Sequence, residues 1–209
     1  MYRNVINGYS RLMARPRKFD EAQVVAASRD VFWNQGYAAT SIDDLSAATG
    51  LGRGSFYKAF GDKHSMFLRG LELYCTDAVD GIRAELRDPD LTAYERLVAH
   101  LHRVAAGAAS DTELRGCLLA KSASELSSVD PDVAKLTKRT LDIWLRELTA
   151  TVRAAQADGD IPADADPKRL ASLLLAVLRG IEALRKGGAS AATVKAAAEQ
   201  AVALLGAGA

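Results

Sequence analysis

The sequence predicts an all-α protein in which a small three-helix domain precedes a larger helical domain. Almost half of its 209 residues are apolar, Ala and Leu dominate, and aromatic residues make up only 6%. Apolar residues recur at helical spacing, and residues that favour helix starts and stops separate the periodic segments. We find no strand pattern and no internal repeat.

Two short helices and a turn follow an opening helix near the N-terminus. The first helix is predicted from Asp20 to Gly36, with an apolar stripe along one face. The second begins at Ser41, an N-cap whose partner in a capping box is Asp44, and ends at Gly50. A third helix starts directly after this glycine turn. The three helices together predict a helix-turn-helix domain over residues 19–61.

The third helix has a polar outward side. Placing its residues every 100° buries Phe56 and Phe60 on one side. The other side and its edges carry Arg53, Gly54, Ser55, Tyr57 and Lys58. A cation, a phenol, a hydroxyl and a glycine are the groups that a recognition helix offers to the DNA major groove. The alternative interpretation is an ordinary helical hairpin whose charged face is only solvated.

Positive charge is concentrated at the same end of the chain. Residues 1–64 hold nine Lys/Arg and six Asp/Glu, whereas residues 65–209 hold 18 and 20. Residues 1–18 show no periodicity and read as a flexible basic arm that includes Arg17 and Lys18. Such an arm can follow phosphates or enter a minor groove, although a solvated tail is the alternative.

Residues 62–209 form the larger predicted domain, which we expect to mediate dimerisation. Its helices are expected over residues 62–87, 92–106, 115–126, 130–158, 166–186 and 191–205, with a loop at 107–111. The last two helices are apolar on more than one side, so they need a second partner, such as another copy of the chain. A fully intramolecular core is the alternative. The expected dimer interface is Leu174, Val177, Leu178, Ile181, Val194, Ala198, Val202 and Leu205.

Other chemistry has little support in the sequence. His100 and His102 point to different helix faces, so we expect no metal site, and nothing indicates a cofactor or an enzyme. Two cysteines do not make a disulfide framework. A thiol-based response to oxidants or electrophiles is one interpretation of Cys75 and Cys117. Inert packing of both side chains is the alternative. No apolar run is long enough to span a bilayer, and we expect a cytoplasmic protein.

A gapless stretch of the N-terminal domain resembles a known family. Phe32–Leu45, FWNQGYAATSIDDL, and Gly50–Lys63, GLGRGSFYKAFGDK, are similar to the N-terminal signature of the tetracycline-repressor (TetR) family. The resemblance does not extend to the rest of the chain at comparable specificity. It implies a homodimeric regulator, typically a repressor, that binds a palindromic double-stranded operator. A helical protein-interaction module without DNA binding is the remaining alternative.

The resemblance also implies roles for individual residues. Thr40 and Ser41 would touch phosphate, Arg53, Gly54 and Ser55 would meet base edges, Tyr57 and Lys58 would reach backbone or bases, and Lys63 would bind phosphate. It further implies a small-molecule effector among the middle helices. The expected pocket residues are Tyr94, Leu97, Leu101, Cys117, Leu118, Leu141 and Trp144.

Overall fold

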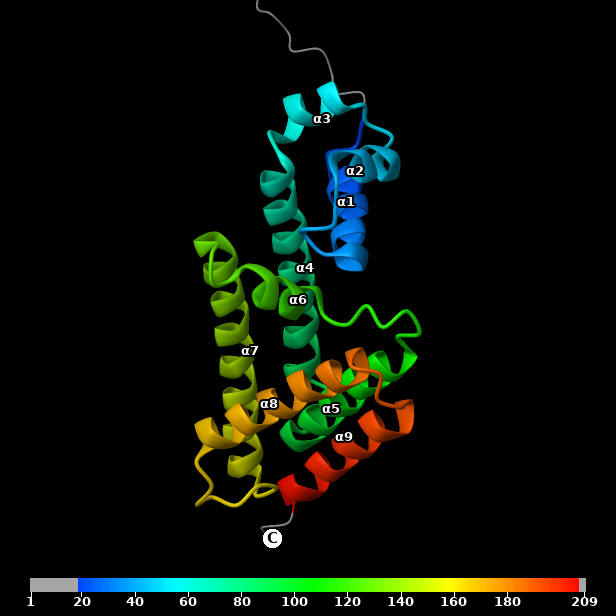
Figure 1. The fold of residues 1–209 in the computed structure, drawn as a ribbon. Helices are drawn as coiled ribbons and strands as arrows, with labels where there is room; N and C mark the ends of the chain where they lie inside the picture. The colour runs from blue at the N-terminus through cyan, green and yellow to red at the C-terminus, as the bar shows by residue number, and fades with distance from the viewer. Residues whose placement is uncertain (1–18, 207–209) are drawn as a thin grey trace, which may run out of the picture.

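The computed structural model describes residues 19–206, which are helical with connecting turns and contain no strand. Figure 1 shows α1–α3 gathered at one end and α4 running from them into the larger body, with α7 beside α4 and α5, α8 and α9 at the far end. The predicted all-α fold is confirmed. The helices are α1 Glu21–Gln35, α2 Ile42–Thr49, α3 Arg53–Phe60, α4 Lys63–Leu86, α5 Ala93–Ser110, α6 Leu118–Leu126, α7 Pro131–Asp158, α8 Pro167–Lys186 and α9 Ala191–Gly206.

Side-chain N-caps explain why several observed helix starts agree with the predicted ones. The carboxylate of Asp20 accepts a hydrogen bond from the N–H of Ala22 at 2.9 Å. Ser41 and Asp44 form the predicted capping box of α2, and Thr92 starts α5 in the same way. These contacts satisfy backbone N–H groups that the first helical turn leaves without partners.

Two boundaries differ from the sequence prediction. Gly107 lies inside α5, which continues to Ser110 instead of ending in a loop. The helix α6 begins at Leu118 and not at Arg115. The carboxylate of Asp111 accepts the N–H groups of Arg115 and Gly116 at 3.1 and 2.8 Å, and Gly116 has φ of +65°. These bonds hold the segment before α6 in a non-helical turn.

The buried residues form two clusters joined by α4. The N-terminal cluster packs Phe32, Leu45 and Phe56 of α1–α3 against Met66 and Phe67 of α4. The second cluster draws on the end of α4 and on α5, α7, α8 and α9. The first turns of α4 thus pack with α1–α3, and we call these segments together the N-terminal unit. The expected domain boundary, in contrast, lies before α4.

Most residues expected at the dimer interface pack inside the protomer, which corrects that prediction. They are at most 3% exposed and belong to the larger core, so they are not available to a second copy. Periodicity finds an apolar face but does not say which partner covers it. The buried residues are Leu174, Leu178, Ile181, Val194, Ala198 and Leu205, while Val177 and Val202 are half-buried.

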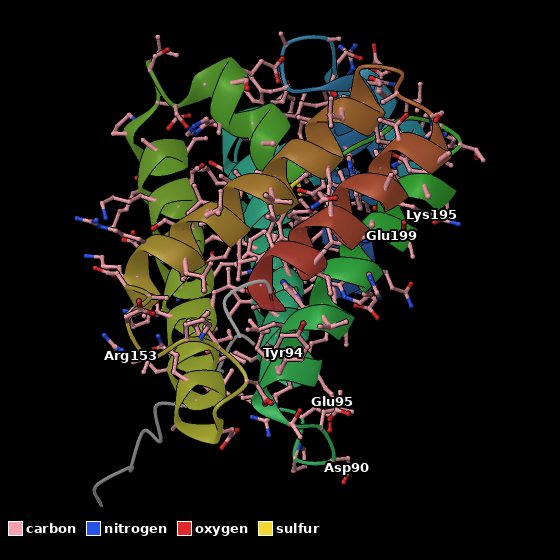
Figure 2. The ribbon with its side chains drawn as sticks, turned by 90° about the horizontal axis from the view of Figure 1, so that it is seen from below. Asp90, Tyr94, Glu95, Arg153, Lys195 and Glu199 are labelled. Atoms are coloured by element: carbon pink, nitrogen blue, oxygen red, sulfur yellow. The ribbon has the colours of Figure 1, made fainter. Side chains whose placement is uncertain are left out.

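The opposite side of α8 and α9 is exposed and mostly apolar, with Gln200 as a polar residue among the alanines of α9. Figure 2 shows the two helices side by side, with Lys195 and Glu199 on the edge of α9 away from α8. Between residues 172 and 184, the exposed side chains of α8 carry no charge. We call this surface the outer α8–α9 face; it comprises Leu173, Ala176, Ala183, Leu184, Ala196, Ala203 and Leu204.

Candidate nucleic-acid interface and cavity

The helix α3 lies at one end of the molecule (Figure 1). Its polar side is exposed to solvent. Phe56 and Phe60 are buried in the N-terminal cluster, which fixes the rotation of α3 about its axis. Every residue of the predicted outward side is exposed, and nothing lies within 4 Å of a Cβ added to Gly54. Arg53, Gly54, Ser55, Tyr57 and Lys58 therefore form one continuous accessible surface.

Arg53 has a partner that sequence reasoning missed. Its Nε donates to Asp43 Oδ1 at 2.6 Å, and its Nη2 donates to Oδ2 of the same carboxylate. This hydrogen bond with Arg53 holds the pKa of Asp43 below its ordinary value. The pair depends on how α2 and α3 cross, because the two residues are ten positions apart in the chain.

The side chains of two expected phosphate contacts are hydrogen-bonded within the chain. The hydroxyl of Thr40 donates to the carbonyl of Gly36 at 2.7 Å, and the residue is only 2% exposed. Lys63 Nζ donates to the carbonyls of Tyr37 and Thr40 at 3.0 and 2.9 Å. Both side chains hold the turn between α1 and α2.

Ser41 is exposed at the start of α2, where its hydroxyl and N–H both donate to Asp44. Its oxygen also accepts the N–H of Asp44, so the side chain is part of the helix cap and not a free donor. Arg17 and Lys18 lie outside the described residues.

The N-terminal unit is tied to the segment around α6. Glu125 accepts the N–H groups of Tyr37 and Ala38 at 3.1 and 3.2 Å. Trp33 Nε1 donates to the carbonyl of Gly116 at 2.8 Å, and the guanidinium of Arg115 lies 4.0 Å from the Trp33 ring centroid. These contacts connect α1 and its following turn directly to the larger domain.

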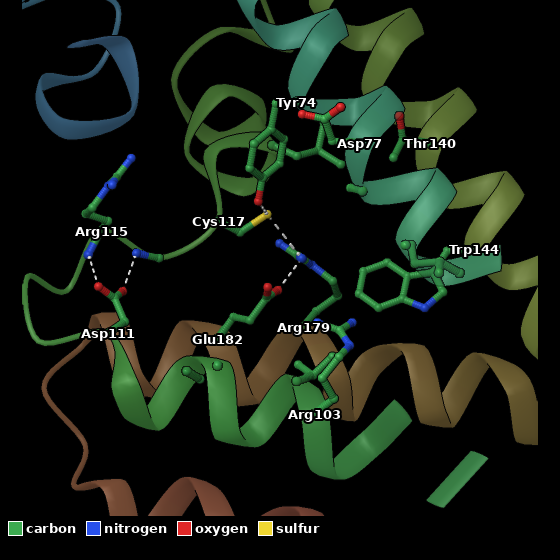
Figure 3. Close-up of a pocket in the computed structure, with 18 of the residues that line it drawn as sticks. Tyr74, Asp77, Arg103, Asp111, Arg115, Cys117, Thr140, Trp144, Arg179 and Glu182 are labelled. Atoms are coloured by element: carbon green, nitrogen blue, oxygen red, sulfur yellow. Dashed lines mark hydrogen bonds and ion pairs between the residues drawn. The ribbon is translucent and has the colours of Figure 1, made fainter. Parts of the chain in front are cut away.

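A cavity of about 440 Å³ lies on the other side of that segment (Figure 3). Its walls come from α4, α5, α7 and α8 and from the residues before α6, with Trp33 of α1 closing one side. Aromatic and small apolar residues share the lining with eight charged ones. The charged residues are Asp77, Glu85, Arg103, Asp111, Arg115, Arg179, Glu182 and Arg185.

Cys117 is the centre of a polar cluster in this cavity. Tyr74 Oη and Arg179 Nη1 each lie 3.3 Å from its Sγ, and Arg179 also donates to Glu182. Figure 3 shows Tyr74 of α4 and Arg179 of α8 pointing toward the sulfur, with Glu182 directed at the guanidinium of Arg179. Burial raises the pKa of both Tyr74 and Glu182 above their ordinary values. Within residues 19–206, no group of His, Cys, Asp and Glu has the arrangement of a metal site.

Comparisons with known proteins agree with this geometry. The model of the family described as bacterial regulatory proteins, tetR family, matches residues 24–69. A second model, tetracyclin repressor-like C-terminal domain, matches residues 93–201 and thus more than half of the chain. The chain belongs to the TetR family.

Individual relatives support the same conclusion. The HTH-type transcriptional repressor ComR of Escherichia coli (strain K12) is 28% identical over 176 residues, which cover 84% of each chain. The transcriptional regulator AcuR of Cereibacter sphaeroides is 28% identical over 162 residues, covering 75% of this chain and 74% of AcuR. A cysteine mutant of the TetR-family regulator CifR, solved with a 26-base-pair operator, has a TM-score of 0.80 and 28% identity, covering 92% of this chain and 100% of CifR. This TetR-family chain is a DNA-binding transcriptional regulator.

The cavity of this TetR-family regulator differs from the pocket that the sequence predicted. Only Cys117 and Trp144 of the seven expected residues line it. The others do not, since Leu97, Leu101 and Leu118 are fully buried in the cores and Tyr94 and Leu141 are half-buried elsewhere. Sequence periodicity identified the apolar faces but not the place where their packing is incomplete.

His100 is hydrogen-bonded to two residues that line the cavity, Trp144 and Glu85. It is fully buried, and Trp144 Nε1 donates to its Nε2 at 2.9 Å. Because indole only donates, His100 Nε2 must be unprotonated, which leaves Nδ1–H to donate to Glu85 at 2.6 Å. Burial opposes the charge of Glu85, but hydrogen bonds from His100 and Arg103 outweigh it and lower the pKa of Glu85. His102 is exposed, which confirms that the two histidines point to different faces.

Among the described residues, no helix combines the length and apolar character needed to cross a membrane.

Proposed function

We propose that this TetR-family regulator is a homodimeric repressor that a small molecule releases from a palindromic operator in the cytoplasm. The observation that carries the proposal is the outward polar side of α3, which is held at one end of the molecule by two buried phenylalanines. Arg53, Gly54, Ser55, Tyr57 and Lys58 are its proposed DNA contacts, with Ser41 at the start of α2 and Arg17 and Lys18 ahead of α1.

The outer α8–α9 face supports the dimer. Its three leucines, Leu173, Leu184 and Leu204, are 54%, 48% and 63% exposed, and alanines and Gln200 separate them. An apolar surface of this kind is stabilised when a second copy covers it about a two-fold axis. That axis would present two α3 helices to successive turns of DNA, so the operator would be palindromic.

The cavity supports regulation by a small molecule. Its volume of about 440 Å³ lies within the range typical of small-molecule sites. The wall at Gly116 is hydrogen-bonded to Trp33 of α1, so a ligand that displaces this wall also acts on the N-terminal unit. Release requires that the effector binds more tightly to the form with low DNA affinity.

Selection from random double-stranded DNA with the full-length chain tests the proposal. We expect enrichment of a palindrome whose half-sites lie about one helical turn or a multiple apart, bound by two copies of the chain. Loss of affinity on raising salt should be steep for this complex. Enrichment of no sequence would instead favour a helical protein-interaction module.

A thiol-responsive regulator is the second candidate, and the position of Cys117 favours it. This thiol lines the cavity and is only half-buried, with Arg179 Nη1 3.3 Å from its sulfur, so a reagent that enters the cavity reaches it. N-ethylmaleimide is a suitable probe. We expect it to lower operator affinity in the wild type and in Cys75→Ser but not in Cys117→Ser; an unchanged affinity in the wild type would rule the candidate out.

A further inference from the structure

The ion pair between Arg53 and Asp43 lies on the DNA-facing surface of the N-terminal unit. Arg53 is the first residue of α3, and Asp43 is the second residue of α2. The carboxylate takes one hydrogen from Nε and one from Nη2, and the two side chains are 64% and 66% exposed. The pair is therefore formed at the surface, beside the outward side of α3.

This arrangement leaves the guanidinium a second edge. A guanidinium carries five N–H donors, and Asp43 uses two of them along the Nε–Nη2 edge. Both hydrogens of Nη1 and one hydrogen of Nη2 remain. Two parallel N–H groups of this kind match the O6 and N7 acceptors of guanine in the major groove. Asp43 thus binds the edge that base recognition does not need.

Asp43 has no other described contact that explains its place. The capping box of α2 is complete with Ser41 and Asp44, and Asp43 takes no part in it. A carboxylate on a DNA-facing surface also repels phosphate and works against affinity. Its favourable interaction with the helix N-terminus is weak at an exposed position.

We propose that Asp43 is a positioning residue for sequence recognition: it holds the Arg53 guanidinium by its Nε edge and directs the Nη edge to a guanine in each operator half-site. The inference rests on the proposed contact between α3 and base edges. Arg53 is a long side chain with many rotamers, and it would lose that freedom on binding a base. The pair with Asp43 selects one orientation before DNA arrives, so binding requires less ordering.

A double-mutant cycle tests this role with the full-length chain. Wild type, Asp43→Ala, Arg53→Ala and the double variant are compared on the selected operator, on the same operator with the guanine replaced in both half-sites, and on random DNA. We expect Arg53→Ala to abolish the guanine preference. We expect Asp43→Ala to reduce that preference about tenfold while it tightens binding to random DNA. In the Arg53→Ala background, removal of Asp43 should tighten binding to all three DNAs alike.

Three results would overturn the inference. In the first, Asp43→Ala tightens binding to every DNA equally and keeps the guanine preference, so that Asp43 only repels phosphate. In the second, Arg53→Ala relaxes no guanine position. In the third, the wild type selects no sequence, and the proposed function then fails with it. Asp43→Asn keeps the shape of the side chain but only one acceptor, so it should give an intermediate preference and replaces Asp43→Ala if that variant does not fold.

Discussion

Lys121 Nζ lies 2.6 Å from the carbonyl oxygen of Trp33, so the ammonium group of a residue on α6 caps the C-terminal end of α1. The same nitrogen is 3.3 Å from the carbonyl of Asn34. Carbonyls at a helix C-terminus lack intrahelical partners, and a cation satisfies them and complements the helix dipole. With Glu125, one turn later, α6 binds both the end of α1 and the turn that follows.

Replacement of Lys121 by Met removes this ammonium and keeps the aliphatic stem. We expect the free energy of unfolding to fall by about 1–2 kcal/mol, because a charged donor to two carbonyls is lost. Urea unfolding measures the change. Lys135→Met is the control, since this exposed lysine on α7 makes no contact recorded for the described residues. Equal losses in the two variants would contradict the role of Lys121.

Lys63 and Lys58 should differ in how their loss affects DNA binding. Lys63→Met removes two hydrogen bonds to carbonyls, so we expect a loss of about 1–2 kcal/mol in unfolding free energy and little change in salt dependence. Lys58 is exposed on α3, and Lys58→Met should leave stability unchanged but reduce the salt slope by about one per protomer. The measurements are urea unfolding and operator affinity against salt; a reversed pattern would restore the sequence-based role of Lys63 as a phosphate contact.

The sequence predicted local features of this site well and tertiary ones poorly. The cap of α2 by Ser41 and the outward side of α3 depend on residues within a few positions of each other, so spacing was enough. The pairing of Arg53 with Asp43 and the burial of Thr40 depend on how the helices cross. No short-range pattern records that angle.

The same limit applies to the larger domain. The helix α8 has two apolar sides, and only the structure shows that Leu174 and Leu178 face the protomer core while Leu173 faces out. The position of the cavity is also hard to predict from the sequence, because a cavity forms where side chains fail to make contact. Leu97 and Leu101 were expected to line the pocket that the family resemblance implies, but close packing places both in the core.

Glu147 should make stability depend on pH in the acid range. Arg87 donates to its carboxylate at 2.6 and 2.9 Å, and Arg83 lies 3.4 Å away. The hydrogen bonds from Arg87 lower the pKa of Glu147 below its ordinary value of 4.5. Because the pKa of this carboxyl is lower in the folded state than in the unfolded state, its stabilisation is complete above the unfolded-state pKa. The stabilisation is lost as pH falls through the folded-state pKa.

Glu147→Gln tests this dependence. We expect it to lower the unfolding free energy by about 1–2 kcal/mol at pH 7, with exposure of both arginines limiting the effect. The difference from wild type should shrink as pH falls below about 4.5, the ordinary Glu value. Urea unfolding at a series of pH values measures it. A difference that stays constant with pH would show that packing, and not charge, is responsible.

A charge on the outer α8–α9 face should prevent dimerisation. Ala176→Arg places an unpaired cation at the centre of the uncharged surface of α8, and we expect dimer affinity to fall at least about tenfold. Sedimentation measures the oligomeric state, and circular dichroism checks the fold. Ala84→Arg, at an exposed position on α4, is the control. An Ala176→Arg chain that stays dimeric would place the interface elsewhere.

The two cysteines should react at very different rates. Cys75 is 3% exposed, and burial raises its pKa to about 11, so about one thiol in a thousand is ionised at pH 8. Cys117 is half-buried, and its sulfur lies in the cavity within 3.3 Å of Arg179 Nη1. The thiolate is the nucleophile and access also limits the rate, so burial and the raised pKa both slow Cys75, whereas the sulfur of Cys117 is reached from the cavity.

Timed labelling with iodoacetamide, followed by mass spectrometry, separates the two thiols. We expect Cys117 to be modified first in the native chain and Cys75 to react only once the chain is unfolded or the pH approaches its raised pKa. Cys117→Ser should therefore be almost unlabelled at pH 8 until urea is added. Labelling of Cys75 at the rate of Cys117 in native protein would mean that the N-terminal cluster opens often, because its buried thiol reacts only through such openings.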